Sequence, residues 1–138
     1  QFLDIENESK EINKGAIENI HSLKTGKLIE CSVMLGQIGN NMTQQNEILL
    51  NFSKKIGLAF QITDDILEVI SDEKTLGKNI NSDTKNQKST YINVLGIDEA
   101  IKRSKELSKS AILDISILKL KEADMLIELA KYISYRER

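Results

Sequence analysis

The stretch Phe60-Gln61-Ile62-Thr63-Asp64-Asp65-Ile66-Leu67-Glu68 places three acids and an amide inside an otherwise apolar helical segment. At ~100° per residue in an α-helix, the polar side chains of this region share an arc of about 100°. They are Gln61, Asp64, Asp65, Glu68 and Asp72. The rest of the same helix surface carries Leu58, Ala59, Phe60, Ile62, Ile66, Leu67, Val69 and Ile70. An acidic stripe beside so much apolar surface is not typical of a solvated helix face.

Carboxylates that lie close together repel one another, and partial burial adds to the free-energy cost of keeping them charged. A bound cation offsets that cost. Asp64 and Glu68 are one turn apart and can bracket one ion, whereas Asp65 can brace the site or take a second ligand position. Oxygen ligands favour a hard ion, Mg²⁺ first, with water or a phosphate completing its shell. The stripe therefore predicts half of a magnesium–diphosphate site, with a solvated helix face as the alternative.

The composition predicts an all-α protein with an aliphatic core. The 138 residues are 40% hydrophobic and 4% aromatic, and they include no proline to interrupt a helix. A net charge of −2 with interspersed signs gives no electrostatic case for nucleic acid or an anionic membrane. No apolar run approaches the roughly 18 residues of a membrane span, and no signal peptide is visible. The single Cys31 excludes an internal disulfide. We expect a cytoplasmic helical bundle.

Apolar residues at helical spacing predict helices over residues 11–20, 21–38, 43–71, 91–95, 98–118 and 122–135. Asp98 is the expected N-cap of the fifth helix. Cys31 belongs to the apolar stripe of the second helix, and we expect it to pack in the core. The polar, aperiodic segment 72–90 predicts a loop of the kind that covers or binds a ligand.

Basic residues at three places are candidates for contacts with a phosphate. In Lys24-Thr25-Gly26, a lysine and a hydroxyl stand beside a glycine. Because glycine has no side chain, a phosphate can approach the backbone closely here and contact the lysine and the hydroxyl. Lys78 and Lys88 lie on the segment after the acidic helix and can balance the charge of a polyanion. For each lysine alone, the alternative is an ordinary surface residue. His21 has no partner pattern and is expected to be structural or exposed.

In this order, the motifs resemble those of the trans-isoprenyl diphosphate synthases, the polyprenyl synthetase family, close to its short-chain farnesyl and geranylgeranyl members. The matching pieces are Gln1-x-x-Asp4-Ile5, Lys24-Thr25-Gly26, Gly57-Leu58-Ala59-Phe60-Gln61-Ile62-Thr63-Asp64-Asp65-Ile66-Leu67, Leu76-Gly77-Lys78, Lys88-Ser89-Thr90-Tyr91 and the basic tail Arg136-Glu137-Arg138. The similarity extends over the whole chain with the expected spacings.

The resemblance implies an isoprenoid-synthase fold, Mg²⁺ dependence and head-to-tail condensation of isopentenyl diphosphate with an allylic diphosphate. It makes Asp64, Asp65 and Glu68 the second aspartate-rich motif, with Asp64 the expected direct metal ligand. It assigns Lys24 and Lys78 to the allylic diphosphate, and Thr25 and Gln61 to the region near the developing cation. A homodimer is also implied.

The sequence departs from the family pattern in two respects. Glu68 stands where the family usually has Asp, and its longer side chain can still reach an ion or a metal-bound water. The first aspartate-rich motif has no counterpart in residues 1–138, so we expect the chain to be the C-terminal part of a single domain and to be inactive alone. A class I terpene cyclase and a non-catalytic subunit that regulates an active synthase are the alternatives. Product chain length is not encoded in this segment.

Overall fold

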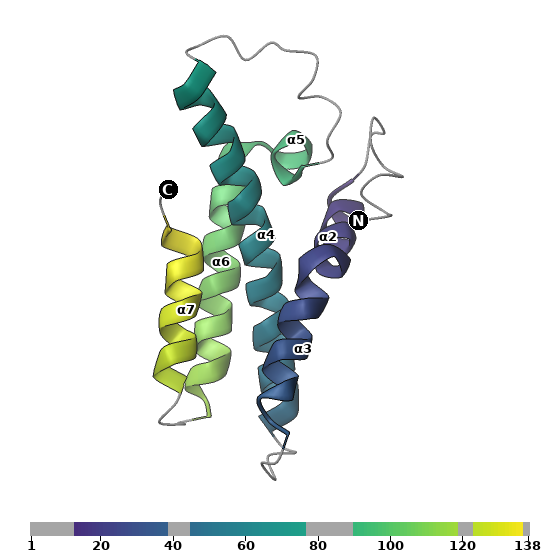
Figure 1. The fold of residues 1–138 in the computed structure, drawn as a ribbon, viewed down its shortest axis with the longest axis vertical. Helices are drawn as coiled ribbons and strands as arrows, with labels where there is room; N and C mark the ends of the chain where they lie inside the picture. The colour runs from purple at the N-terminus through teal and green to yellow at the C-terminus, as the bar shows by residue number, and fades with distance from the viewer. Residues whose placement is uncertain (1–12, 39–44, 77–89, 119–122, 137–138) are drawn as a thin grey trace.

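A long central helix organises the fold. The computed structural model describes residues 13–38, 45–76, 90–118 and 123–136, and the secondary structure within them is entirely helical. The central helix, α4, runs over Asn46–Leu76, which at 1.5 Å per residue is roughly 46 Å. It lies between two groups of helices, one on either side (Figure 1). The all-α class predicted from the sequence is confirmed.

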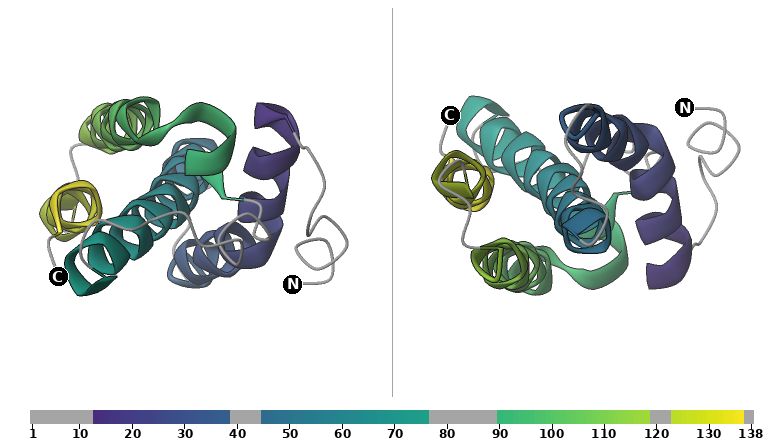
Figure 2. Two further views of the ribbon diagram at one scale, coloured as in Figure 1. Left: turned by 90° about the horizontal axis from the view of Figure 1, so that it is seen from above. Right: turned by 90° about the horizontal axis from the view of Figure 1, so that it is seen from below.

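On one side of α4, three helical segments follow one another as a bent rod. They are α2 (Lys14–His21), the π-helical turn η1 (Ser22–Gly26) and α3 (Lys27–Leu35). Asn13 caps α2, because its side-chain oxygen accepts a hydrogen bond from the Ala16 N–H at 3.0 Å. The contacts of the rod with α4 come mainly from α3 and η1, whereas α2 diverges from α4, as Figure 2 shows.

On the other side of α4, two helices form an antiparallel hairpin (Figure 1). They are α6 (Ile97–Ser116) and α7 (Ala123–Tyr135), and both contact α4. The short helix α5 (Tyr91–Leu95) precedes them and contacts α2 as well as α4 and α6. Gly96 joins α5 to α6 at a φ of +82°, a left-handed conformation that glycine adopts without strain.

The core is aliphatic and follows the inner face of α4, as the composition predicts. Burial of this apolar surface is the main force that holds the helices together. The buried cluster consists of Ile17, Leu49, Phe52, Ile56, Ala59, Ile62, Ile66, Tyr91, Ala100, Leu107, Ala111, Ile115, Ala123, Ala130 and Ile133. Among the residues that the structure describes, no helix is both long enough and apolar enough to cross a bilayer.

Three expectations about the helices need correction. The N-cap of α6 is Gly96, and Asp98 lies within the first turn, where its negative charge still favours the helix dipole. Helix α4 continues to Leu76, so the polar segment predicted as a loop from residue 72 begins as helix. The helix predicted over residues 21–38 is divided, because a π turn replaces its first residues and α3 ends at Leu35.

The prediction that Cys31 packs in the core is wrong, because its side chain is exposed. The apolar stripe of α3 exists, but it faces outward from the described residues: Leu28 is 71% exposed and Leu35 is 59% exposed. Helical spacing shows only that such residues share a face; it does not show which neighbour covers that face.

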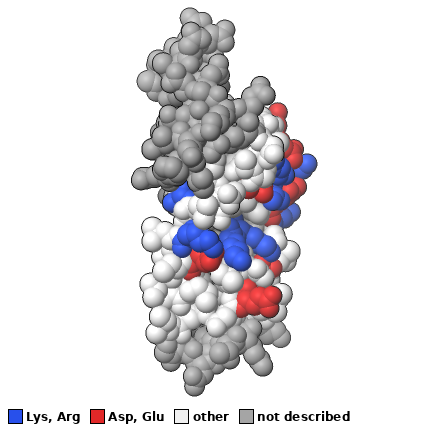
Figure 3. Space-filling model, turned by 90° about the vertical axis from the view of Figure 1, so that its right-hand side faces the viewer, with Lys and Arg blue, Asp and Glu red and all other residues white. Residues whose placement is uncertain are grey.

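On the side of the molecule shown in Figure 3, basic and acidic groups lie next to one another.

Candidate functional site

The acidic turn of α4 lies between the rod and the hairpin, and its neighbouring carboxylates point to different partners. Asp65 is 8% exposed, whereas the side chain of Asp64 is 42% exposed. Successive residues of a helix are rotated by about 100°. Asp64 therefore faces α7 while Asp65 faces α2 and α5, as their contacts below show.

Asp65 connects α4 to two other helices. Its Oδ2 accepts a hydrogen bond from the backbone N–H of Tyr91 at 2.7 Å and lies 3.4 Å from Nε2 of His21. Burial raises the pKa of Asp65 to about 6, although the Tyr91 N–H and the charge of Lys24 act to lower it. His21 is buried, which agrees with the structural role expected for it. Of the two roles predicted for Asp65, this geometry favours the bracing one.

Tyr91 is held in turn by an ionic contact between α2 and α6. Its ring is fully buried, and its hydroxyl donates a hydrogen bond to Oε1 of Glu18 at 3.0 Å. Nη2 of Arg103 lies 3.3 Å from the same oxygen. Burial, followed by the bond to Glu18, raises the pKa of Tyr91 to about 12. This chain of contacts fixes the backbone N–H on which Asp65 depends.

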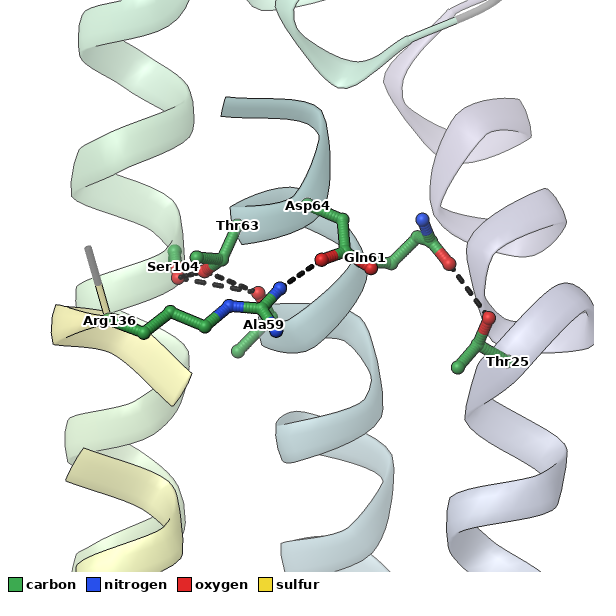
Figure 4. Close-up of polar contacts among 7 residues, drawn as sticks. All are labelled: Thr25, Ala59, Gln61, Thr63, Asp64, Ser104 and Arg136. Atoms are coloured by element: carbon green, nitrogen blue, oxygen red, sulfur yellow. Dashed lines mark hydrogen bonds and ion pairs between the residues drawn. The ribbon is translucent and has the colours of Figure 1, made fainter. Parts of the chain in front are cut away.

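Asp64 meets a cation from the end of the chain. Nη2 of Arg136, which directly follows α7, donates a hydrogen bond to Oδ1 of Asp64. The guanidinium carbon lies 4.4 Å from the centre of the Phe60 ring, in a cation–π contact. Figure 4 shows Arg136 reaching across from the yellow helix to α4. The preceding residue, Thr63, anchors α4 to α6 through a buried contact of 2.8 Å between its hydroxyl and that of Ser104.

On the opposite side of α4, the π turn supplies Thr25. Its hydroxyl donates a hydrogen bond to Oε1 of Gln61 at 2.8 Å (Figure 4). Short π-helical turns are frequent at functional sites. The two helices approach closely here, since a Cβ built on Gly57 would stand only 2.8 Å from Cα of Gly26. The structure thus brings together Thr25 and Gln61, which the sequence analysis assigned to one site.

Lys24 and Glu68 are exposed near this turn. The Lys24 charge acts to lower the pKa of Asp65, while the charges of Glu68 and Asp64 act to raise it. These four charged groups therefore lie within electrostatic reach of one another. Lys78 and Lys88 lie outside the described residues, as do Gln1, Asp4 and the side chain of Asp72.

The donor chemistry of this turn suits a hard divalent ion. Asp64 and Glu68 offer carboxylate oxygens one turn apart, and the guanidinium of Arg136 shows that a cation can stand against Asp64. Within the described residues, no three His, Cys, Asp or Glu side chains form a cluster that could hold a metal ion. Of the two aspartates, Asp64 is the one whose carboxylate contacts a cation at the surface, whereas Asp65 is buried.

Arg136 and the Glu18–Arg103 pair could not be assigned to the site from the sequence. In the sequence, Arg136 is part of a basic tail, and 72 positions separate it from Asp64. The pair is likewise separated by 85 positions. Contacts over such separations leave no local pattern in one sequence, so only the fold reveals them.

Comparison with known proteins supports the resemblance. Residues 1–126 match the family model described as Polyprenyl synthetase. The chain is 38% identical to the farnesyl diphosphate synthase of Escherichia coli K12, an alignment that covers 100% of this chain and 48% of that protein. It is 37% identical to the farnesyl diphosphate synthase of Bacillus subtilis, covering 99% and 46% respectively. The chain therefore spans about half the length of the curated relatives it matches.

Solved structures show the same fold. The geranylgeranyl pyrophosphate synthetase of Pyrococcus horikoshii matches with a TM-score of 0.83 and 30% identity, over 99% of this chain and 54% of that one. A geranyltransferase of Helicobacter pylori, solved with magnesium and isoprenyl diphosphate, matches with a TM-score of 0.75 and 30% identity, over 96% of this chain and 44% of that one. With its helical fold, its acidic turn and these relatives, the chain belongs to the polyprenyl synthetase family.

Proposed function

We propose that this chain forms one wall of the active site of a prenyl diphosphate synthase, which joins isopentenyl diphosphate head-to-tail to an allylic diphosphate. The observation that carries the proposal is the acidic turn of α4, where Asp64 lies next to the Thr25–Gln61 contact. Similarity to farnesyl diphosphate synthases and to a geranyltransferase solved with magnesium and isoprenyl diphosphate supports it.

The reaction develops a negative and a positive charge, and different residues would stabilise each of them. Breaking the allylic C–O bond produces a diphosphate leaving group and a carbocation, so the enzyme must stabilise concentrated negative charge. Mg²⁺, when bound, would supply that stabilisation. Asp64 and Glu68 would hold the ion, with Asp65 as a further ligand or as the brace, while Lys24 and Lys78 would contact the diphosphate.

The carbocation needs surroundings that exclude water, since water would trap it. Gln61 is buried, and Ile62 and Ile66 beside it belong to the buried core. Thr25 and Gln61 would line the site near the developing cation, the role that the resemblance implies for them. Their hydrogen bond holds both side chains in fixed orientations before the substrate arrives.

The test is Asp64→Ala in the complete synthase. We expect turnover to fall by several orders of magnitude, because a charge-stabilising metal ligand is lost. Asp98→Ala is the matched control, since Asp98 is exposed in the first turn of α6. Near-normal turnover of the Asp64 variant would rule out the ligand assignment. A regulatory subunit would show no turnover in either variant, and a cyclase would consume allylic diphosphate without isopentenyl diphosphate.

We further propose that residues 1–138 are the C-terminal part of one domain and do not turn over alone. The chain spans about half the length of its relatives, and the remaining half would be needed to complete the site. Condensation of isopentenyl and dimethylallyl diphosphates by the purified chain would contradict this. A homodimer and a cytoplasmic location remain predictions. Light scattering on the complete protein measures the first directly, and cell fractionation measures the second.

A further inference from the structure

In the contact between Arg136 and Asp64, the arginine side chain is largely buried and the aspartate side chain is not. The side chain of Arg136 is 15% exposed, whereas that of Asp64 is 42% exposed. The guanidinium rests on the Phe60 ring at 4.4 Å, and one N–H donates to Oδ1 of Asp64. Nε of Arg136 is buried with no hydrogen-bond partner among the described residues. The guanidinium is therefore held by stacking and by one carboxylate, with part of its hydrogen-bonding capacity unused.

The same carboxylate is the expected metal ligand of the proposed function. A divalent ion at Asp64 and the guanidinium of Arg136 would be like charges a few ångströms apart, which repel strongly in a partly buried site. Each cation therefore weakens the binding of the other. Because coupling between two binding events is reciprocal, the factor by which Arg136 weakens the ion equals the factor by which the ion weakens the docking of Arg136.

We propose that Arg136 is a positioning residue that holds the Asp64 carboxylate until a divalent ion binds, and that the ion then releases the end of α7. This inference rests on the proposed function, since it takes Asp64 as the metal ligand. The guanidinium of Arg136 stacks on the Phe60 ring while it contacts Asp64. Figure 4 shows the arrangement, with Asp64 between Arg136 and the site that Gln61 and Thr25 form.

The experiment measures Mn²⁺ binding to the full chain by electron paramagnetic resonance, without diphosphate. In Arg136→Gln, we expect the Kd for Mn²⁺ to fall roughly two- to fivefold, as the loss of a partly exposed competing ion pair implies. Lys131→Gln is the matched control. It removes the same charge from α7, the helix that Arg136 directly follows, but Lys131 pairs with Glu128 at 2.7 Å on an exposed face, so the Kd of this variant should not change.

Two further measurements separate competition for Asp64 from a general charge effect. Phe60→Leu keeps every charge but removes the ring under the guanidinium, so it should also tighten Mn²⁺ binding. Hydrogen exchange of the amides in residues 130–136 should become faster when Mn²⁺ binds to the unmodified chain. In Arg136→Gln the same amides should exchange rapidly with or without the ion.

An unchanged or weaker Mn²⁺ affinity in Arg136→Gln overturns the inference, as does an equal tightening in Lys131→Gln. If turnover is lost in Asp64→Ala while Arg136→Gln binds Mn²⁺ like the unmodified chain, the proposed function stands and the role of Arg136 fails. If neither form binds Mn²⁺ in the absence of diphosphate, an ion alone does not release Arg136 and this inference fails, while the metal assignment is decided separately by the turnover of Asp64→Ala.

Discussion

Gly57 of α4 packs against Gly26 of the π turn so closely that a Cβ on Gly57 would stand 2.8 Å from Cα of Gly26. Nothing larger than hydrogen fits on Gly57 without moving a backbone. The converse does not hold, because the nearest atoms that a Cβ on Gly26 would meet are His21 O, at 3.7 Å, and atoms of Ser22. The close approach therefore requires glycine at position 57 but leaves room for a larger residue at position 26.

Gly57→Ala should reduce the free energy of unfolding by about 1–3 kcal/mol, since overpacking forces the two helices apart. Gly26→Ala is the control and should change stability little, because its added methyl group finds ordinary contacts. Urea unfolding followed by circular dichroism measures both. Equal effects of the two substitutions would show that the close approach is not what limits the position.

The hydrogen bond between Thr25 and Gln61 should appear as a coupling free energy. We expect Thr25→Val and Gln61→Leu each to lose stability, and the double variant to lose about 1 kcal/mol less than the sum, because one bond is removed in each case. Urea unfolding of the four proteins gives the value. Additive losses would mean that the bond contributes nothing to the fold.

Asp65 should make stability fall as the pH rises from about 4 to about 6. Its pKa is raised from 3.8 to about 6, so the folded state binds the proton more tightly than the unfolded state over this window. The contribution is favourable below the window and is lost above it, by up to about 3 kcal/mol. Asp65→Asn cannot ionise, and its side-chain oxygen can still accept the Tyr91 N–H. We therefore expect a smaller fall in this variant.

Urea unfolding at a series of pH values without divalent ions measures this dependence. Asp98→Asn, at an exposed position, is the control and should keep the slope of the unmodified chain. If Asp65→Asn also kept that slope, burial of Asp65 would not be the source of the dependence.

Tyr91→Phe should lower the free energy of unfolding by about 0.5–1.5 kcal/mol, because it removes the bond to Glu18 while the buried ring remains. Tyr91→Ala should cost about 3–5 kcal/mol by leaving a cavity. Tyr132 is 65% exposed, and Tyr132→Phe should therefore stay within about 0.5 kcal/mol. Thermal unfolding ranks the three, and any other order would contradict the assigned contacts.

The sequence predicts the parts of the fold that depend on local periodicity. Helices α4 to α7 follow from apolar spacing, and apolar residues on their inner faces, such as Leu107 and Ile115, are buried. The exposure of Cys31 could not be predicted, because an apolar stripe shows which residues share a helix face but not which part of the protein covers that face. The resemblance, rather than periodicity, placed Thr25 near Gln61.

The predicted acidic site was incomplete for a geometric reason. Asp64 and Asp65 are adjacent, and one residue of rotation sends them to α7 and to α5 respectively. Sequence alone shows the charges but not which oxygen a distant backbone N–H or guanidinium will take. Arg136 and Tyr91 became visible as partners only when the chain was folded.

The π turn between α2 and α3 has a consequence for the phase of the whole rod. A π turn holds about one residue more than an α turn, which shifts every later residue by roughly 100° around the axis. On α2, Ile17 and Ile20 are buried, whereas Leu28 and Leu35 on α3 are exposed. Deleting one of residues 22–24 would rotate α3 by about the same angle relative to α2 and carry Thr25 away from Gln61. A single surplus residue thus sets the registration of the site.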